Sequence, residues 1–175
     1  MAYEGGAFEE PFMKYALFYV LSVVIANWGF DLVPLVTLPG GEAWAPMSLF
    51  VGFVFVVRDY AQREIGHMVL PAMLAGGLIS WLMASPAIAL ASVCAFLTSE
   101  IMDWAVYTFT GRPFSQRILL SSCLSTPIDS IVFLAMVGLF SVPSVIVMTL
   151  SKMAGAIIVY LLARRRELAP ARAGA

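Results

Sequence analysis

Residues 53–67 read FVFVVRDYAQREIGH, and this stretch decides the fold. Five apolar residues lead, with no Pro or Gly between them, directly into Arg58, Asp59, Gln62, Arg63 and Glu64. A helix of a soluble protein would turn such charges onto a wet face. Because the flanking sequence offers little polar surface, the stretch predicts a helix that carries charges into an apolar bundle.

The composition of the 175-residue chain is typical of a membrane protein. It is 61% hydrophobic and 12% charged, with a mean hydropathy of +0.91, whereas globular domains are about 45–50% apolar and about 25% charged. One transmembrane helix needs about 20 mostly apolar residues, so the chain has room for roughly five to seven helices and no soluble catalytic domain. No basic run outside the C-terminal tail is long enough to bind nucleic acid, and no nucleic-acid partner is expected.

Six apolar segments predict an all-α polytopic membrane protein, a six-helix transmembrane bundle. The segments are about 12–30, 47–65, 68–84, 86–109, 118–140 and 143–163. The expected transmembrane domain is 12–163, between an N-terminal segment, 1–11, and a basic tail, 164–175. The charges before the first segment, Glu4, Glu9 and Glu10, are wrong for a cleaved signal peptide, so the first segment is expected to be retained.

The positions of Lys and Arg predict the orientation. The first, third and fifth connections contain neither residue, whereas Arg112 and Arg117 flank the fourth and Arg164, Arg165, Arg166 and Arg172 follow the sixth segment. Cytoplasmic loops are enriched in these residues. Both termini are therefore expected in the cytoplasm, with the protein in a bacterial inner membrane.

Several charges fall in or near the apolar segments, where each costs about 2.5–3.5 kcal/mol at a helix centre. Their helical spacing places them on shared faces: Asp59 with Gln62 and Arg63, Glu100 with Asp103 and Tyr107, Thr126 with Asp129, and Thr149 with Lys152. Asn27 adds an amide from the first segment. The pattern predicts that the polar faces of five helices converge on one interior site.

Some of these charges also admit a structural interpretation. Arg63 and Glu64 fit a cytosolic helix end, and Arg58 fits a side chain that extends to the interface. Asp129 and Lys152 fit a structural ion pair across the fifth and sixth segments. Glu100 and Asp103 are harder to explain this way, because two carboxylates one turn apart in apolar sequence repel unless cations or donors meet them.

The residues offer little for catalysis. There is no HExxH pattern, the single histidine, His67, lies at a helix end, and no Gly-rich phosphate loop is present. Cys94 and Cys123 lack CxxC partners and are expected to be small buried hydrophobes. We therefore expect no enzyme activity, no metal and no cofactor.

A polar cavity lined from several helices is the usual solution for a transporter. Carboxylate, amide and hydroxyl groups suit a polar organic molecule that forms hydrogen bonds. Aromatic residues on the same faces suit stacking on a flat ring: Trp28, Phe30, Trp104 and Tyr107. Trp28 and Trp81 also fit an interfacial aromatic belt.

Three stretches and one lysine resemble the vitamin uptake transporter (VUT) family, also called the queuosine precursor transporter family. They are RDYAQREIG (58–66), LASVCAFLTSEIMDWAVY (90–107), SSCLSTPIDSIVFLAMVG (121–138) and Lys152. The resemblance implies a six-helix fold like that of the substrate-binding component of energy-coupling factor transporters. It also implies uptake of 7-deazaguanines such as preQ0, preQ1 or queuine. The chain departs from the family in its compact third connection and in Glu100, where some members carry Gln.

The polar positions that the resemblance implies are Asn27, Asp59, Arg63, Glu100, Asp103, Asp129 and Lys152. With the aromatic and hydroxyl residues, the predicted substrate-binding set is Asn27, Trp28, Asp59, Arg63, Glu100, Asp103, Tyr107, Thr126 and Asp129. A carboxylate such as Glu100 or Asp103 would accept the paired N–H groups of a guanine-like edge, and Asn27 would bond the ring carbonyl. Lys152 would keep Asp129 ionised.

Three other functions remain open from the sequence. The chain fits a vitamin-binding subunit that needs a separate ATPase module, a membrane-embedded enzyme that uses Glu100 and Asp103, or a purely structural subunit. The expected partners are a small deazapurine or vitamin-like substrate, the lipid bilayer, and either a second copy of the chain or an ATPase module.

Overall fold

The computed structural model describes residues 13–83 and 86–173, which are almost entirely helical. The helices are α1 (Lys14–Leu32), α2 (Ser48–Ile65), α3 (Val69–Met83), α4 (Pro86–Phe109), α5 (Phe114–Met136) and α6 (Val142–Ala173). A 3-10 turn, η1 (Gly66–Met68), joins α2 to α3. Two short antiparallel strands, β1 (Val36–Thr37) and β2 (Ala43–Trp44), lie between α1 and α2.

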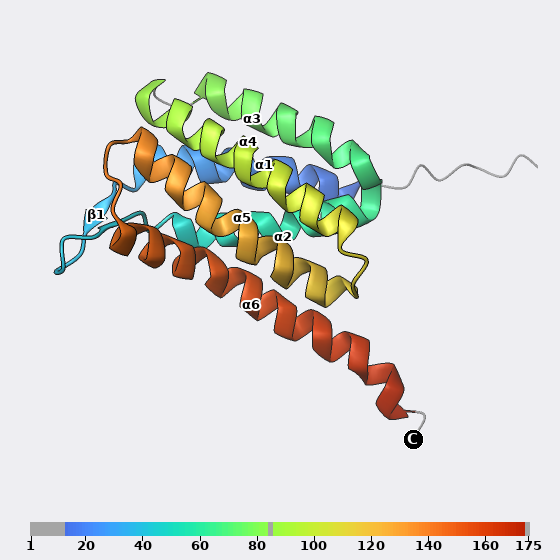
Figure 1. Cartoon of the computed structure of the whole chain (residues 1–175). Helices are drawn as coiled ribbons and strands as arrows, with labels where there is room; N and C mark the ends of the chain where they lie inside the picture. The colour runs from blue at the N-terminus through green and yellow to red at the C-terminus, as the bar shows by residue number, and fades with distance from the viewer. Residues whose placement is uncertain (1–12, 84–85, 174–175) are drawn as a thin grey trace, which may run out of the picture.

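The helices form a ring in which each packs most closely against two neighbours. The cyclic order is α1, α2, α6, α5, α4 and α3, and α2 also meets α4 and α5 across the centre. Figure 1 shows that successive helices run in opposite directions, so α1 begins at the end of the bundle where α6 finishes. This topology brings polar residues from distant parts of the sequence to one interior.

Helix bounds differ from the prediction at both ends of the fifth helix, which ends at Met136 rather than near residue 140, and at the end of the sixth. The fifth helix begins at Phe114 rather than near residue 118, because Pro113, at φ −53°, already has the backbone angle that starts a helix. The sixth helix continues to Ala173, beyond the predicted end at 163, and Arg, Glu and Leu after that point are good helix formers. The predicted N-terminal segment, 1–11, lies outside the described residues.

The turn between α2 and α3 divides one long apolar stretch. Ser48–Leu82 counts as a single 35-residue candidate among five candidate membrane spans in the described chain. A straight helix of that length would measure about 52 Å, whereas the hydrocarbon core is about 30 Å thick. Gly66 ends α2 with φ +59°, a conformation that glycine adopts readily. The polytopic all-α architecture is thus established, and a separate sixth crossing by the 15-residue α3 stays a prediction.

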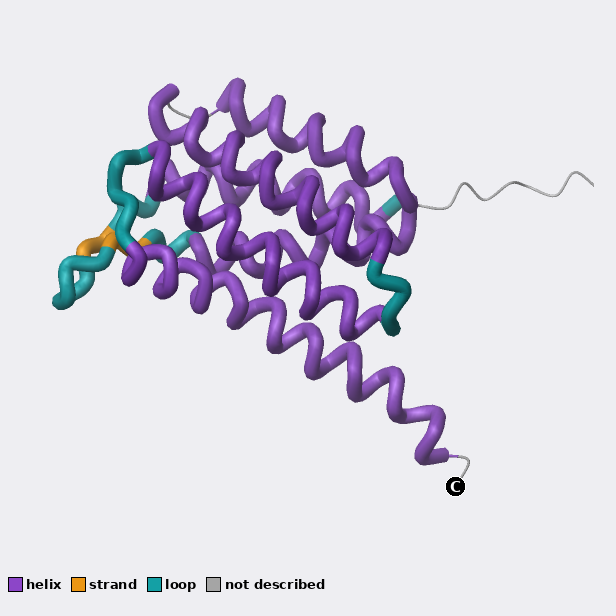
Figure 2. The backbone as a smooth tube through the Cα atoms, viewed as in Figure 1, coloured by secondary structure: helices purple, strands orange, loops and turns teal. Residues whose placement is uncertain are grey.

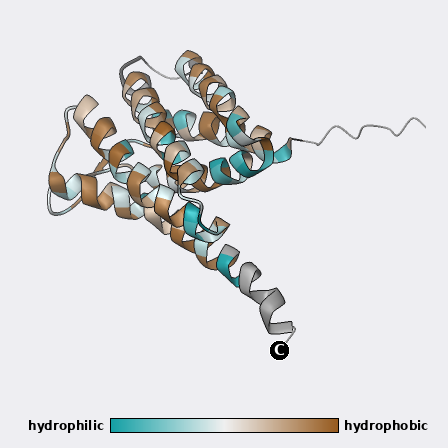
Figure 3. Cartoon of the chain, turned by 45° about the vertical axis from the view of Figure 1, so that its right-hand side comes forward, coloured by the Kyte–Doolittle hydropathy of each residue, from teal (hydrophilic) through white to brown (hydrophobic). Residues whose placement is uncertain are grey.

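The surface of the ring is apolar, and its interior contains charged and polar side chains among apolar ones. Leu78, Leu150 and Ile158 are about 60% exposed, whereas Arg58 and Lys152 are fully buried. Figure 3 shows hydrophobic residues over the helices, with the most hydrophilic ones toward one end. A water-soluble protein rarely exposes such apolar area, so the outer faces are suited to lipid.

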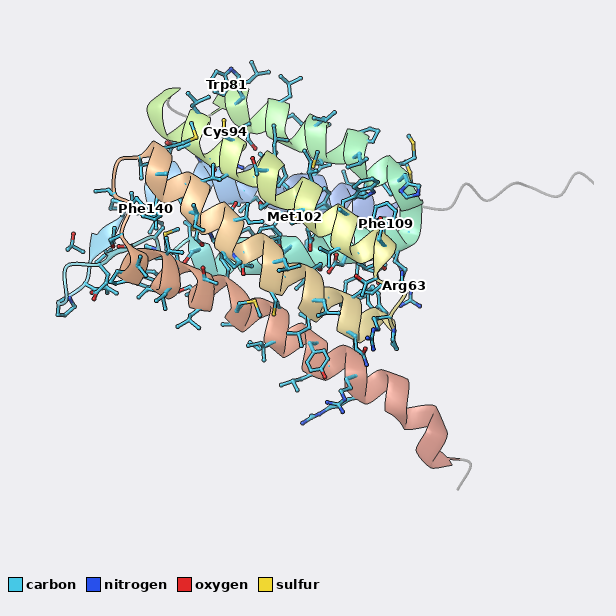
Figure 4. The ribbon with its side chains drawn as sticks, in the orientation of Figure 1. Arg63, Trp81, Cys94, Met102, Phe109 and Phe140 are labelled. Carbon is cyan, nitrogen blue, oxygen red and sulfur yellow. The ribbon has the colours of Figure 1, made fainter. Side chains whose placement is uncertain are left out.

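Both cysteines are more exposed than the sequence predicted, because they lie on outer faces of the helices. Cys123, expected to be buried, is exposed on α5, and Cys94 is half-buried on α4. Trp81 projects from the outside of α3 (Figure 4), in agreement with a place in the aromatic belt rather than in the interior. In lipid, an apolar residue gains nothing by pointing inward, so burial does not follow from hydrophobicity.

The two ends of the bundle differ in charge and in structure. Figure 2 places the strands and the longer loops at one end, where the β hairpin contacts α6 through the Trp44 indole nitrogen and Ser151 Oγ, 2.9 Å apart. Neither connection at that end, 33–47 or 137–141, contains Lys or Arg. Figure 4 shows Arg63 at the opposite end from Phe140. The basic residues therefore gather where α6 leaves the bundle.

Helices α2 and α6 approach each other so closely that only glycine fits between them. A Cβ atom on Gly52 would lie 2.0 Å from the carbonyl oxygen of Lys152. On the facing helix, a Cβ on Gly155 would lie 3.1 Å from the carbonyl carbon of Gly52. Small residues permit such backbone approach in membrane bundles, and here the contact fixes the position from which the Lys152 side chain enters the interior.

Candidate functional site

Two groups of buried polar side chains occupy the interior. The first, which we name the arginine cluster, lies between α1, α2, α4 and α5, and each of its members is at most 1% exposed. Its members are Tyr19, Arg58, Asp59, Glu100, Asp103 and Ser121. Four helices contribute to it, so its geometry depends on the assembled ring.

Arg58 stands at the centre of the arginine cluster. Its Nη1 lies 2.9 Å from Asp59 Oδ1 and 3.3 Å from Asp103 Oδ2, and its Nε lies 3.3 Å from Glu100 Oε2. The Tyr19 hydroxyl donates to Glu100 Oε2 at 2.8 Å, and Ser121 Oγ donates to Asp59 Oδ2 at 3.4 Å. One guanidinium thus serves three carboxylates.

The arginine cluster is not balanced. Fully ionised, its three carboxylates and one guanidinium have a formal charge of −2. Several of its buried atoms have no hydrogen-bond partner among the described residues: Arg58 Nη2, Glu100 Oε1 and both Asp103 carboxylate oxygens. Buried charge without compensation is expensive, so the cluster requires positive charge beyond Arg58.

Tyr107 separates the arginine cluster from the basic end of the bundle. Its ring is 5% exposed, with the Arg58 Cζ 5.9 Å and the Arg117 Cζ 5.3 Å from the ring centroid. Phe114 packs edge-on against the Tyr107 ring at 6.3 Å between centroids. Aromatic rings therefore cover this side of the cluster.

The second group, which we name the cavity cluster, surrounds a cavity of about 20 Å³ between α1, α2, α4, α5 and α6. That volume is about enough for one water molecule. Three polar side chains line it, Asn27, Ser92 and Asp129, and three phenyl rings lie beside them, from Phe30, Phe96 and Phe133. The cavity is narrow, with flat rings and a few polar groups on its walls.

Asp129 is held by donors from two neighbouring helices. Lys152 donates its ammonium to Asp129 Oδ2 and also to Ser130 Oγ at 2.9 Å, while Ser99 Oγ donates to Asp129 Oδ1 at 3.2 Å. Asp129 is 7% exposed and Lys152 fully buried. This one-to-one pair is electrically neutral, unlike the arginine cluster.

Asn27 is positioned by its own helix and by α4. Its Nδ2 donates to the Val23 carbonyl at 2.9 Å, and its Oδ1 accepts from the Ser92 hydroxyl. Thr126, one turn before Asp129 on α5, turns its hydroxyl back to the Ser122 carbonyl at 2.7 Å. Asn27 therefore faces the cavity, whereas Thr126 is fully buried and bonded to backbone.

The residues predicted to form one site are divided between the two clusters. Asp59, Glu100 and Asp103 meet in the arginine cluster, which Tyr107 covers, and Asn27, Asp129 and Lys152 meet in the cavity cluster. Ser99 and Glu100 are consecutive on α4, so the clusters adjoin there. The expectation of a single convergent site is corrected to two adjoining ones.

Besides Thr126, two predicted residues lie outside both clusters. Trp28 is 53% exposed on the outer side of α1, because it follows Asn27 by one position and points about 100° away from it. Arg63 is exposed at the end of α2, with its Cζ 4.7 Å from the Phe114 ring centroid. Trp104, also considered for stacking, instead donates to His67 Nδ1 at 3.2 Å.

Several site residues were missed from the sequence. Tyr19 and the rings of Phe96 and Phe133 belong to long apolar runs and show no local signal there. Ser92 and Ser99, seven residues apart on α4, form a polar stripe in line with Asp103 that could have indicated the face. Arg58 was considered, and the structure buries it fully rather than letting it extend to the interface.

The described residues contain no group of three or more His, Cys, Asp or Glu side chains arranged to hold a metal ion. In the arginine cluster, the guanidinium stands among the carboxylates, where a metal would have to be. The chemistry that both clusters offer is therefore hydrogen bonding, ion pairing and proton exchange.

Apolar helices that enclose a polar, multi-helix interior define the class: a multi-pass membrane protein built as a carrier of small molecules. Over residues 15–164 the chain matches the family described as a putative vitamin uptake transporter, and it belongs to that family. The predicted family is thereby confirmed, and the chain is a transporter rather than an enzyme. The comparison with curated proteins and the comparison with solved structures each found no match.

Proposed function

We propose that the protein takes up queuosine precursors, 7-deazaguanines such as preQ0, preQ1 or queuine, across a bacterial inner membrane. The observation that carries this proposal is the cavity cluster, in which phenyl rings and three hydrogen-bonding side chains, those of Asn27, Ser92 and Asp129, line one narrow space. A flat, polar heterocycle matches both kinds of wall. The family resemblance adds the specific class of compound.

The proposed contacts follow from the chemistry of the walls. A carboxylate accepts two parallel N–H groups in a forked arrangement, and Asp129 is the carboxylate that lines the cavity. Asn27 both donates and accepts, which suits a ring carbonyl beside an N–H group. Phe96 and Phe133 offer faces for stacking, as aromatic side chains do for nucleobases.

The cavity has to widen to accept such cargo, since about 20 Å³ holds about one water molecule. Alternating access by movement of one helix group against another supplies such widening in transporters. From the sequence, Glu100 or Asp103 was expected to accept the paired N–H groups of the cargo. In this proposal Asp129 has that role, because Glu100 and Asp103 face Arg58.

The proposed orientation places both termini in the cytoplasm. Lys14, Arg63, Arg112 and Arg164 are exposed at the end where α1 begins and α6 leaves the ring. The positive-inside rule assigns that end to the cytoplasm. The same arrangement puts the β hairpin on the outer side of the inner membrane, the side from which cargo arrives.

The test is uptake of labelled preQ1 by bacteria that lack their own route. Cells with the parent protein should accumulate preQ1, whereas Asp129→Asn and Asn27→Ala should each lose at least tenfold in initial rate. Glu42→Gln, which removes a carboxylate from the loop between the strands, is the matched control and should leave uptake unchanged. Uptake that survives both cavity substitutions would refute the proposed site.

A second candidate is a vitamin-binding subunit that works with a separate ATPase module. The family description names vitamin uptake, which favours the cargo class of this candidate. Competition by unlabelled queuine, preQ0, riboflavin and biotin separates the two cargo classes. Expression in a host without such modules separates the two modes of action. Uptake of preQ1 in that host, blocked by queuine and unaffected by the vitamins, would exclude this candidate.

A further inference from the structure

The arginine cluster has a charge deficit that its own side chains do not remove. Asp59, Glu100 and Asp103 are each at most 1% exposed, and Arg58 is the one cation in contact with them among the described residues. Two negative charges in a lipid-enclosed interior would each cost several kcal/mol. A bound proton is the smallest species that lowers this charge, and it needs no space beyond an oxygen lone pair.

We propose that the arginine cluster is a proton-binding site, with Glu100 as the protonated carboxyl, and that the proton is the coupling ion of transport. The coupling rests on the proposed transport function, whereas the proton site stands on the cluster alone. Neither the family assignment nor the cavity cluster requires this site.

The contacts of Glu100 leave one of its oxygens able to take a proton, whereas those of Asp59 do not. Both donors that reach it, the Tyr19 hydroxyl at 2.8 Å and the Arg58 Nε at 3.3 Å, meet Oε2, which leaves buried Oε1 without a partner. Asp59 receives a donor on each oxygen, Arg58 on Oδ1 and Ser121 on Oδ2. A proton on Glu100 Oε1 therefore breaks no existing hydrogen bond.

Asp103 also has oxygens without a hydrogen-bond partner in the described chain, but the Ser121 and Ser125 hydroxyls stand near it on α5, and we assign it the charge that remains. Its Oδ2 lies 3.3 Å from Arg58 Nη1, so it stays within the field of the guanidinium. Neutral Glu100 leaves two carboxylates against one guanidinium, a formal charge of −1 in place of −2. The proton thus halves the buried charge.

The groups around Glu100 define what influences its proton. Tyr19 faces it from α1, Arg58 and Asp59 from α2, and Asp103 from its own helix. From α5, Ser121 reaches Asp59, and Arg117 stands beyond the Tyr107 ring. From α6, Lys152 is bound to Asp129, and α3 contains no titratable side chain.

The proton site adjoins the cargo site through α4. Ser99, which precedes Glu100, donates its hydroxyl to Asp129 Oδ1 at 3.2 Å. A cargo that engages Asp129 displaces or shifts this hydroxyl, and the backbone carries the shift to the next residue. This contact supplies a physical connection between cargo binding and the Glu100 proton.

The first test is infrared spectroscopy of purified protein in lipid, which separates the carbonyl stretch of a protonated carboxyl from that of a carboxylate. The parent should show a protonated carboxyl at pH 7 that Glu100→Gln removes. Glu64→Gln is the matched control, because Glu64 accepts backbone N–H groups of α1 outside the cluster, and it should keep the band. A parent spectrum without any protonated carboxyl at pH 7 overturns the proposal, even if Glu100→Gln fails to fold.

The second test uses proteoliposomes and labelled preQ1 as the probe. One pH unit, acidic outside, should drive up to about tenfold accumulation by the parent if one proton accompanies each cargo molecule. Glu100→Gln should lose that accumulation and still exchange internal for external preQ1 at equal pH. The Glu64→Gln control should keep both activities.

The outcomes separate this proposal from the proposed function. Exchange of preQ1 by the parent without any response to the pH gradient refutes proton coupling and leaves the cargo assignment intact. No preQ1 exchange at all refutes the cargo assignment, and the infrared experiment then decides the proton site by itself. A gradient response that Glu100→Gln retains refutes Glu100 as the proton carrier.

Discussion

The cavity cluster and the arginine cluster are both buried among the same helices, yet their charges are arranged differently. In the cavity cluster, Lys152 meets Asp129 one to one, beside a space lined by phenyl rings. In the arginine cluster, Arg58 serves three carboxylates, and none of the three lines that space. A balanced ion pair that lines a cavity suits cargo binding, whereas an unbalanced buried charge suits the binding of a proton.

The comparison also shows what burial costs in each region. A neutral ion pair in lipid is tolerated when its remaining donors and acceptors are used. Lys152 also donates to Ser130 Oγ, and Asp129 also accepts from the Ser99 hydroxyl. For a carboxylate without a cation, the free-energy cost of burying the charge is not offset in this way. The difference between the clusters therefore predicts different responses to the loss of a single charge.

Removing the central cation should have the largest effect. Arg58→Met leaves three buried carboxylates with no cation, and we expect a loss of about 3–5 kcal/mol in stability or failure to accumulate in the membrane. Thermal unfolding of the purified protein in detergent measures it. Arg63→Met, on the exposed end of the same helix, is the control and should change stability by less than about 0.5 kcal/mol.

The neutral pair should respond differently when both partners are removed. Lys152→Met alone strands the Asp129 charge and should cost about 3–5 kcal/mol, whereas addition of Asp129→Leu should restore most of that loss, because apolar residues of similar size replace such pairs at little cost. The double variant should remain folded and fail to take up preQ1. If it were no more stable than Lys152→Met, the pair would not be the balanced unit described here.

A smaller effect is expected where α2 meets α6. Gly52→Ala places a Cβ 2.0 Å from the Lys152 carbonyl oxygen, so the helices must separate, at a cost of about 1–3 kcal/mol. Gly77→Ala on α3 is the control, since its Cβ would meet Leu97 Cδ2 at an ordinary 3.6 Å. Equal melting temperatures for the two variants would contradict this close approach.

The smallest effect is expected from substitution of Trp28, which was predicted to bind substrate but lies on the outer side of α1. Trp28→Leu alters an exposed side chain and should leave preQ1 uptake and stability unchanged, within about 0.5 kcal/mol for stability. Phe133→Leu, in the cavity wall, should reduce uptake several-fold. The reverse result would return Trp28 to the site and would show that the cavity is not where cargo binds.

Much of the fold could be predicted from the sequence, because lipid imposes a simple rule on it. Apolar runs of about 20 residues form helices. The division of Lys and Arg between alternate connections predicted which connections lie at the same end of the bundle. Helix ends were less predictable. Phe114 and Ala173 fall beyond the predicted bounds, since local helix propensity decides ends that hydropathy does not mark.

The site could be predicted only in part. Spacing along each helix correctly grouped Glu100 with Asp103, because residues three apart share a face whatever the fold. It did not decide the places of Trp28 and Arg63, for which the sequence offered both the site and the membrane interface and which the structure leaves exposed. Residue spacing does not show which face of a helix points to the interior of the bundle, particularly when every face of that helix contains apolar residues.

The sequence by itself determined that charges lie within membrane helices and which of them share a face, since hydropathy and helical periodicity are local properties. Only the tertiary structure decided which charges meet. Arg58 joins three carboxylates and Lys152 joins one because the ring order of the helices and the close approach at Gly52 set the distances between them. Coulomb energies in a medium of low dielectric depend on those distances, and no stretch of sequence contains them.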